Sequence, residues 1–225
     1  MKWLAVVLLV AAASGAQAQT APTRNEIAIY AGLHEAAAKG DVAEIEKLIA
    51  DGEKPNIQDS RSRTPLLVAA YLKQHAAARA LIKHGANPNA LDIDRYDIVT
   101  IAAVANDLNM LKLALDGGAS AKNITSGYDG TALIAAAHLG HAEAVRMLIA
   151  AKAPLNHVNS LGWTALMEAI VLGNGGANHT ATVKALVEAG CDVNIADRQN
   201  VTPLQHARRR GYVEMARMLE AVGAR

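Results

Sequence analysis

The sequence contains no phenylalanine and only one cysteine in 225 residues, and aromatic residues amount to 3% of it. A lone cysteine cannot form a disulfide within the chain, which excludes a small fold held together by disulfide bridges. With so few aromatic side chains, alanine and aliphatic residues must build the core, and the apolar fraction of 52% is sufficient for one. We expect the thiol of Cys191 to be buried and unreactive; a redox-active thiol is the alternative.

An excess of charge of one sign is also absent. The chain has 22 lysine and arginine residues and 21 aspartate and glutamate residues. Such a balance gives no overall field that would attract nucleic acid or an anionic membrane. We therefore expect the mature protein to bind neither nucleic acid nor a membrane.

The first 18 residues have the pattern of a secretory signal peptide. Lys2 supplies a positive charge, an apolar run extends from Leu4 to Ala13, and Ala16-Gln17-Ala18 forms an A-x-A cleavage site. Cleavage between Ala18 and Gln19 would send the chain to the periplasm or outside a bacterial cell. An uncleaved membrane anchor is the alternative, although the apolar run is short for a bilayer-spanning helix.

The residues that follow the cleavage site predict a leader and then a helix. Residues 19–24, which include Pro22, are expected to form a flexible leader. Thr23 and Glu26 have the spacing of a capping box, in which each side chain bonds the backbone N–H of the other residue. We therefore expect the first helix to begin near Asn25.

One short signal recurs along the rest of the chain at an almost constant interval. Its clearest copies are Thr64-Pro65-Leu66 and Thr202-Pro203-Leu204, in which threonine can cap a helix and proline suits the first helical position. Successive copies begin 33 or 34 residues apart, except that the last step is 38 residues. Such a period is the length of one supersecondary unit in a stacked array. The six units start near Ala31, Thr64, Asp97, Thr131, Thr164 and Thr202.

Each unit also carries the signals of two consecutive helices. An alanine pair such as Ala69-Ala70 lies in the first helix, and an apolar pair such as Leu81-Ile82 lies in the second. A glycine such as Gly85 then ends the second helix in a left-handed conformation. Lys152 stands at this glycine position in the fourth unit, so we expect a positive φ there. The third unit, which begins Asp97-Ile98-Val99, departs most from the pattern and is expected to be locally weaker.

Together these signals resemble the ankyrin repeat over residues 25–225. The resemblance implies an all-α solenoid of about six helix–turn–helix units, joined by short hairpin loops, whose concave side commonly binds another protein. It also implies a structural role for His34, whose ring would bridge backbone groups of a loop. We expect a chain that is monomeric without its partner and is not an enzyme, with no cofactor.

In ankyrin-like units, partners are met by the loop before each cap and by the end of the first helix. Tyrosine, tryptophan and arginine, which dominate interface hot spots, gather at these positions. Packing of Tyr96 and Trp163 against the next loop is the alternative. The aliphatic residues Ile93, Leu161 and Val171 occupy the same positions. The expected partner-binding residues are Arg61, Arg63, Tyr71, Tyr96, Tyr128, His138, Trp163, Arg198 and Arg209.

Catalytic and metal-binding motifs are weak by comparison. His138 and His141 have a spacing that suits zinc, but zinc needs further ligands, and we expect no metal site. The fifth unit contains the one insertion, residues 173–179, which is rich in glycine. We expect this insertion to be a flexible surface loop or a contact loop. A metal or small-ligand site at this loop, with His138, His141 and His179, is the remote alternative.

The sequence therefore predicts an exported bacterial ankyrin-repeat protein that binds a partner protein through its concave face. Two kinds of partner remain open. One is a toxin delivered into the cell envelope, against which the protein would act as an immunity protein. The other is a periplasmic enzyme such as a catalase, for which it would be an accessory factor.

Overall fold

The repeat signals become pairs of antiparallel helices in the computed structural model, which describes residues 19–225. The predicted signal peptide lies outside the described residues. The first helices of the six units are α3 (Gly32–Lys39), α5 (Pro65–Tyr71), α7 (Ile98–Val104), α9 (Ala132–His138), α11 (Ala165–Val171) and α13 (Pro203–Arg209). The second helices are α4 (Val42–Ala50), α6 (His75–Lys83), α8 (Leu108–Asp116), α10 (Ala142–Ala150), α12 (Ala177–Glu188) and α14 (Val213–Ala221).

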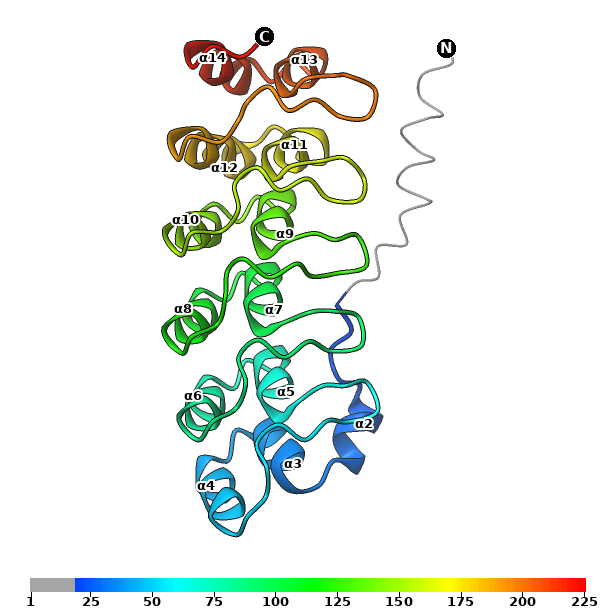
Figure 1. The fold of residues 1–225 in the computed structure, drawn as a ribbon, viewed down its shortest axis with the longest axis vertical. Helices are drawn as coiled ribbons and strands as arrows, with labels where there is room; N and C mark the ends of the chain where they lie inside the picture. The colour runs from blue at the N-terminus through cyan, green and yellow to red at the C-terminus, as the bar shows by residue number, and fades with distance from the viewer. Residues whose placement is uncertain (1–18) are drawn as a thin grey trace.

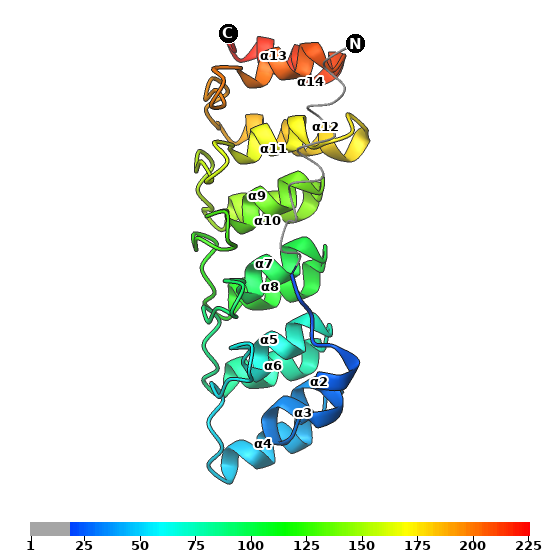
Figure 2. The same ribbon diagram turned by 90° about the vertical axis from the view of Figure 1, so that its right-hand side faces the viewer.

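The two helices of each unit form two columns, and the loops between units project beyond the column of first helices (Figure 1). We call the side formed by the first helices and these loops the inner face. The stack bows gently toward the second helices, so the inner face is concave (Figure 1). Figure 2 looks onto this face and shows the loops along one edge of it. The predicted all-α solenoid of six helix–turn–helix units is confirmed.

The first helices begin where the repeated signals place them. The hydroxyl of Thr64 accepts a hydrogen bond from the backbone N–H of Leu67, and Asp97 does the same for Thr100. Thr131, Thr164 and Thr202 cap their helices in the same way, whereas Ala31 offers no side-chain cap to the first unit. Each capped N–H is one of the donors that a helix start would otherwise leave unpaired.

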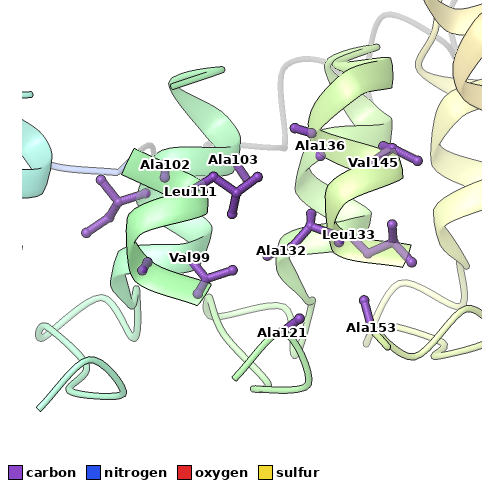
Figure 3. Close-up of a cluster of buried hydrophobic side chains, with 14 of the residues drawn as sticks. Val99, Ala102, Ala103, Leu111, Ala121, Ala132, Leu133, Ala136, Val145 and Ala153 are labelled. Carbon is purple, nitrogen blue, oxygen red and sulfur yellow. The ribbon is translucent and has the colours of Figure 1, made fainter. Parts of the chain in front are cut away.

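The core runs along the middle of the stack and consists of small and aliphatic side chains. Figure 3 shows part of it in units three and four, where Ala102 and Leu111 of unit three and Leu133 and Val145 of unit four belong to the same buried cluster. All four are fully buried or nearly so. Alanine at such positions lets neighbouring helices approach closely, and interiors tolerate few voids. A core without phenylalanine is therefore possible because each unit needs to fill only the thin space to its neighbours.

Two lysines occupy positions at which other units have glycine. Lys152, after α10, has a φ of 64°, and Lys73, after α5, has a φ of 58°. The predicted positive φ at Lys152 is therefore confirmed. Left-handed backbone is unfavourable for a residue that has a Cβ, so each lysine stores a small amount of strain.

A short helix that does not belong to the repeat precedes the first unit. Helix α2 (Arg24–Ile29) begins with the predicted capping box between Thr23 and Glu26. The leader before it, which was expected to be flexible, instead packs on the stack: Pro22 is buried, and the carbonyl of Thr20 lies 3.4 Å from Nη1 of Arg63. Residues 19–30 lie over the inner face beside α3 and α5 in both views (Figures 1 and 2).

The single cysteine is part of the core. Cys191 is buried, as predicted, at the end of the helix pair of the fifth unit. Burial raises the pKa of its thiol to about 11, and the nearby carboxylate of Asp192 acts in the same direction. A thiol in such surroundings is protonated at neutral pH and therefore a poor nucleophile.

Candidate partner-binding face

Four of the loops on the inner face are each held by one side chain at the base of the loop. Oδ1 of Asp92 accepts hydrogen bonds from the backbone N–H groups of Asp94 (3.0 Å) and Tyr96 (2.8 Å). Asp59, Asn159 and Asp197 each make the same pair of bonds two and four residues further on. Such local side-chain bonds fix a turn without a partner strand. The sequence signal was available but missed: each of these residues lies five positions before the cap of a first helix.

Successive loops are also joined to one another. The backbone N–H of Ile93 donates to the carbonyl of Arg61 over 2.9 Å, and Ser160 donates to Tyr128 over 2.8 Å. Side chains add to this ladder: Nη2 of Arg61 lies 2.6 Å from Oδ2 of Asp94, and the guanidinium of Arg198 bonds the carbonyl of Ser160. Two of the predicted partner residues, Arg61 and Arg198, therefore also order the loop edge.

The second oxygens of Asp92 and Asp197 tie their loops to a first helix, whereas that of Asp59 bonds Tyr30 and Arg63. The hydroxyl of Tyr71, at the end of α5, donates to Oδ2 of Asp92 over 2.6 Å, and Nε2 of His206 in α13 lies 2.7 Å from Oδ2 of Asp197. Burial by itself would raise the pKa of Asp197, but the hydrogen bonds from Val201 and His206 outweigh it, and the pKa lies below its ordinary value. These contacts make loops and helices one preformed surface.

In unit five the basal residue is Asn159, and a buried carboxylate of the first helix, that of Glu168, makes the bond between the loop and the helix. Glu168 of α11 is 4% exposed, and its Oε1 accepts a hydrogen bond from Nδ2 of Asn159 over 2.9 Å. Its Oε2 lies 3.0 Å from Nδ1 of His138, at the end of α9 in the preceding unit. A buried acid is tolerated because both of its oxygens have partners. One side chain of α11 thus fixes the loop before it and the neighbouring helix.

Two of the predicted partner residues are not on the surface, which corrects the predicted set. Arg63 is fully buried, because residues 19–30 cover its guanidinium. Tyr96 is 8% exposed and packs in the core, as the alternative for this residue proposed. Trp163, the other residue of that alternative, is half-buried. Of the remaining six, Tyr71, Tyr128 and Arg61 are half-buried, and His138, Arg198 and Arg209 are exposed.

Exposed aliphatic side chains complete the face, and sequence reasoning missed two of them. Leu139 and Leu172 are the C-cap residues of α9 and α11, and 40% and 41% of their surfaces are exposed. On the loop edge, Ile93 and Leu161 are 58% and 41% exposed. The available signal was positional, since both leucines directly precede a glycine that ends the first helix. We call Ile93, Tyr128, Leu139, Leu161, Trp163 and Leu172 the apolar contact set.

The row of C-cap residues ends in positive charge. Arg210 is the C-cap of α13 and so stands in unit six where Leu172 stands in unit five. Arg210 and its neighbour Arg209 are exposed, and neither forms an ion pair with any described residue. Arg208, in contrast, pairs with Glu220 on α14. The inner face thus has exposed apolar side chains in units three to five and carries these two exposed guanidinium groups at its C-terminal end.

The histidines named in the metal alternative are each engaged separately. Nδ1 of His141 lies 2.9 Å from the carbonyl of Ala103, and Nε2 of His179 lies 3.0 Å from the carbonyl of His138. Over residues 19–225 no three histidine, cysteine, aspartate or glutamate side chains lie together in a way that could hold a metal ion. His34 is buried, and its Nε2 lies 2.8 Å from the carbonyl of Arg63, a contact that fits the structural role implied by the resemblance.

The insertion in unit five is anchored at both sides. Its last residues form the first turn of α12, where His179 reaches the carbonyl of His138 in unit four. From unit six, the hydroxyl of Tyr212 donates to the carbonyl of Gly173 over 2.9 Å. Its ring packs against Gly175, where an added Cβ would lie 2.4 Å from the ring. The insertion therefore connects units four, five and six. It lies at the end of the first helices that is opposite the loop edge.

The part of the chain that the structure describes has no helix with the length and apolar character needed to cross a membrane.

Comparison with known structures supports the fold as described. The crystal structure of an ankyrin repeat domain from Acinetobacter baumannii AYE is 44% identical and superposes with a TM-score of 0.83, covering 86% of this chain and 98% of that one. A solved complex of the predatory endopeptidase Bd0816 of Bdellovibrio bacteriovorus with the immunity protein Bd3460 also contains a similar chain. That match covers 85% of this chain and 98% of the other with a TM-score of 0.70, but at 22% identity it speaks for the fold alone.

Comparison of sequences gives the family. The ankyrin repeat protein YahD of Escherichia coli K12 is 34% identical over 190 residues, which are 84% of this chain and 94% of that protein. Family models described as ankyrin repeats in three copies match residues 33–125 and 99–197, and one described as ankyrin repeats in many copies matches residues 175–220. The chain belongs to the ankyrin repeat family.

Proposed function

We propose that this protein is exported from a bacterial cell and, without being an enzyme, captures a partner protein on its inner face. Ankyrin repeat arrays are protein–protein interaction modules, and this face has the composition that such a role needs. The observation that carries the proposal is the apolar contact set, which leaves Leu139, Leu172 and Ile93 exposed on a preformed surface. Exposed apolar side chains grouped on one face of a soluble protein mark interaction sites.

The rigidity of the face supports tight binding. Basal residues such as Asp92 and Asn159 fix each loop, and backbone bonds such as that from Ile93 to Arg61 join the loops. A surface that is ordered before it binds loses little conformational entropy on binding. Docking therefore needs no rearrangement of the stack.

The charges at the C-terminal end favour a partner with an acidic region. Arg209 and Arg210 are exposed without an ion pair among the described residues. Complementary charge speeds association and fixes orientation more than it adds to affinity. A fitting partner offers apolar anchors to the contact set and carboxylates next to them, which orients it along the stack.

An immunity role against an envelope toxin is the more specific candidate. The fold is compatible with it, since a chain of similar fold occurs in the solved complex of an endopeptidase with its immunity protein. A protein that blocks a toxin gains from a rigid, preformed face, because it must bind before the toxin acts. Export, on which this role depends, is supported by the signal-peptide pattern of residues 1–18. An accessory role for a periplasmic enzyme is the second candidate.

Affinity capture with two matched double variants tests the binding face. Leu139→Ser with Leu172→Ser removes two exposed anchors of the inner face, whereas Val213→Ser with Val222→Ser removes comparably exposed side chains of α14, at 58% and 52%. A partner that is retained from an envelope extract by the wild type and the α14 variant, and lost by the inner-face variant, is the expected result. Retention by the inner-face variant would reject the proposed face.

The compartment is tested separately. Fractionation of cells that express the full chain is expected to place the protein in the periplasm, with an N-terminus at Gln19 in the purified protein. A cytoplasmic protein that still begins at Met1 would contradict export and with it the immunity role, but not the binding face.

A further inference from the structure

Residues 19–30 lie on the inner face although they are not part of the repeat. They precede the first unit of the stack, and α2 lies beside α3 and α5 in both views (Figures 1 and 2). The side of the stack on which ankyrin arrays bind partners is therefore already occupied at its N-terminal end. The occupant is a segment of the same chain.

The segment is held mainly by one buried arginine. Nη2 of Arg63 lies 2.5 Å from Oε1 of Glu26, Nη1 lies 3.4 Å from the carbonyl of Thr20, and Nε lies 2.7 Å from Oδ2 of Asp59. The hydroxyl of Tyr30 donates to the same oxygen of Asp59 over 2.7 Å. Both ends of the segment thus meet the Arg63–Asp59 pair.

Apolar packing contributes little to this attachment. Helix α2 is six residues long and has no buried residue, and Ile29 is 81% exposed. Pro22 is the one buried residue among residues 19–23. A helix of this length is not stable by itself in water, so α2 depends on the docking contacts. The segment is attached in the way that a peptide ligand is attached, through polar anchors on a surface.

The position that it covers is otherwise part of the partner-facing row. Arg63 is the last loop residue before the cap of its unit, the position that Trp163 occupies in unit five and Val201 in unit six. Those two residues are only partly buried, whereas the side chain of Arg63 is 1% exposed. Contacts with residues 19–30 bury Arg63, whereas Tyr96, at the same position in unit three, is buried by packing in the core. No comparable segment of the described chain covers units five and six.

We propose that the inner face around Arg63 is a docking site for a carboxylate-bearing chain segment, and that residues 19–30 are its tethered occupant. A guanidinium that is removed from water must keep its ionic partners, since an unpaired buried charge is strongly unfavourable. Any segment that replaces residues 19–30 must supply a carboxylate in place of Glu26 and a carbonyl in place of Thr20. The site therefore selects an acidic segment and rejects a basic one.

Hydrogen exchange on the full chain tests whether the segment is docked through this pair. We expect Glu26→Gln to speed exchange of the amides of residues 24–30 by about tenfold or more, because a charged hydrogen bond to a buried group is lost. Glu35→Gln is the matched control, since Glu35 of α3 forms an equally short but exposed ion pair with Lys39. Glu35→Gln should leave the exchange rates of these amides unchanged. Unprotected amides in the wild type, or no effect of Glu26→Gln, would overturn the proposal.

A labelled synthetic peptide of residues 19–30 tests whether the site accepts a ligand in trans. Its fluorescence anisotropy should report binding to the full-length Glu26→Gln protein about tenfold tighter than to the wild type, whose site is filled by its own segment. A peptide that itself carries Glu26→Gln should bind neither protein. Equal binding of the first peptide to both proteins, or to neither, would contradict a tethered occupant. Concentration-dependent dimers of the wild type would show instead that the segment docks on a second copy.

These results are separable from those of the proposed function. Leu139 and Leu172 lie in units four and five, whereas Arg63 lies in the loop before unit two. Loss of partner capture by the leucine variant leaves exchange at residues 24–30 unchanged, and the reverse also holds.

Discussion

Tyr71 donates its hydroxyl hydrogen to the carboxylate of Asp92 over 2.6 Å and so joins the end of α5 to the loop before the next unit. Burial raises the pKa of Tyr71, and the bond to Asp92 adds to that effect. Both residues therefore serve the fold even though Tyr71 lies on the inner face. A tyrosine at a partner-binding position can thus be part of the scaffold that orders the face.

Removal of this hydroxyl tests its contribution to stability. Tyr71→Phe should lower the free energy of unfolding by about 1–2 kcal/mol, because Oδ2 of the buried Asp92 loses its hydrogen-bond donor. Urea unfolding followed by circular dichroism measures the change. Tyr128→Phe is the control, since the Tyr128 hydroxyl has no bonded partner among the described residues and its removal should cost less than about 0.5 kcal/mol. Equal effects of the two substitutions would argue against a role for the bond.

The sequence predicted those parts of the molecule that depend on local signals. Thr64 and Thr202 cap helices because the cap bonds the third residue of the same helix. The capping box of Thr23 and the positive φ of Lys152 are local in the same sense. Because every unit contacts mainly its neighbours, six local predictions add up to the whole fold.

Contacts between distant residues could not be predicted in this way. Arg63 meets Glu26 across 37 residues and is buried by it, although the loop position alone suggested an exposed residue. Glu168 bonds both Asn159 and His138, and these three residues of different types belong to two units. The repeat pattern carries no signal for these contacts, because the residues that make them differ from the usual residues at the same positions of the repeat. This non-repeating contact removes Arg63 from the surface, where the sequence analysis had placed it.

Asp97, the cap of the third unit, should make stability depend on pH. Burial raises the pKa of this carboxyl above its ordinary value, and the bonds from Thr100 and Asn123 offset burial only in part. A raised folded-state pKa gives a contribution to stability that is complete below the unfolded pKa of 3.8 and is lost as the pH rises through the folded pKa. Ionisation of this buried cap at neutral pH is a physical reason to expect a weaker third unit.

Replacement by a neutral cap tests this effect. Asp97→Asn keeps a capping oxygen and cannot ionise, so its free energy of unfolding should exceed that of the wild type at pH 7 and approach it below about pH 4. Urea unfolding over that range measures the difference. Asp41→Asn, at the exposed cap of α4, is the control for replacement of a capping carboxylate by an amide. A difference for Asp97→Asn that shrinks as the pH rises would contradict a raised pKa of Asp97 in the folded protein.

The thiol of Cys191 should be unreactive in the folded protein. Its pKa of about 11 leaves roughly one thiolate in a thousand at pH 8, and the side chain is buried. Alkylation by iodoacetamide should therefore be slower by about a hundredfold or more than in concentrated urea, as measured by mass spectrometry. Equal rates in the folded and unfolded protein would instead support the redox-active alternative.

Lys152 offers a direct test of the strain that the repeat register implies. Its φ of 64° is comfortable for glycine and unfavourable for lysine, and its side chain is exposed. Lys152→Gly should therefore raise the free energy of unfolding by about 0.5–1 kcal/mol, the balance between relief of strain and the greater flexibility of glycine in the unfolded chain. Lys152→Ala also removes the lysine side chain but keeps the Cβ, so it should bring no gain. If alanine stabilises the protein as much as glycine does, the benefit comes from loss of the lysine side chain, and backbone strain at this turn is not its cause.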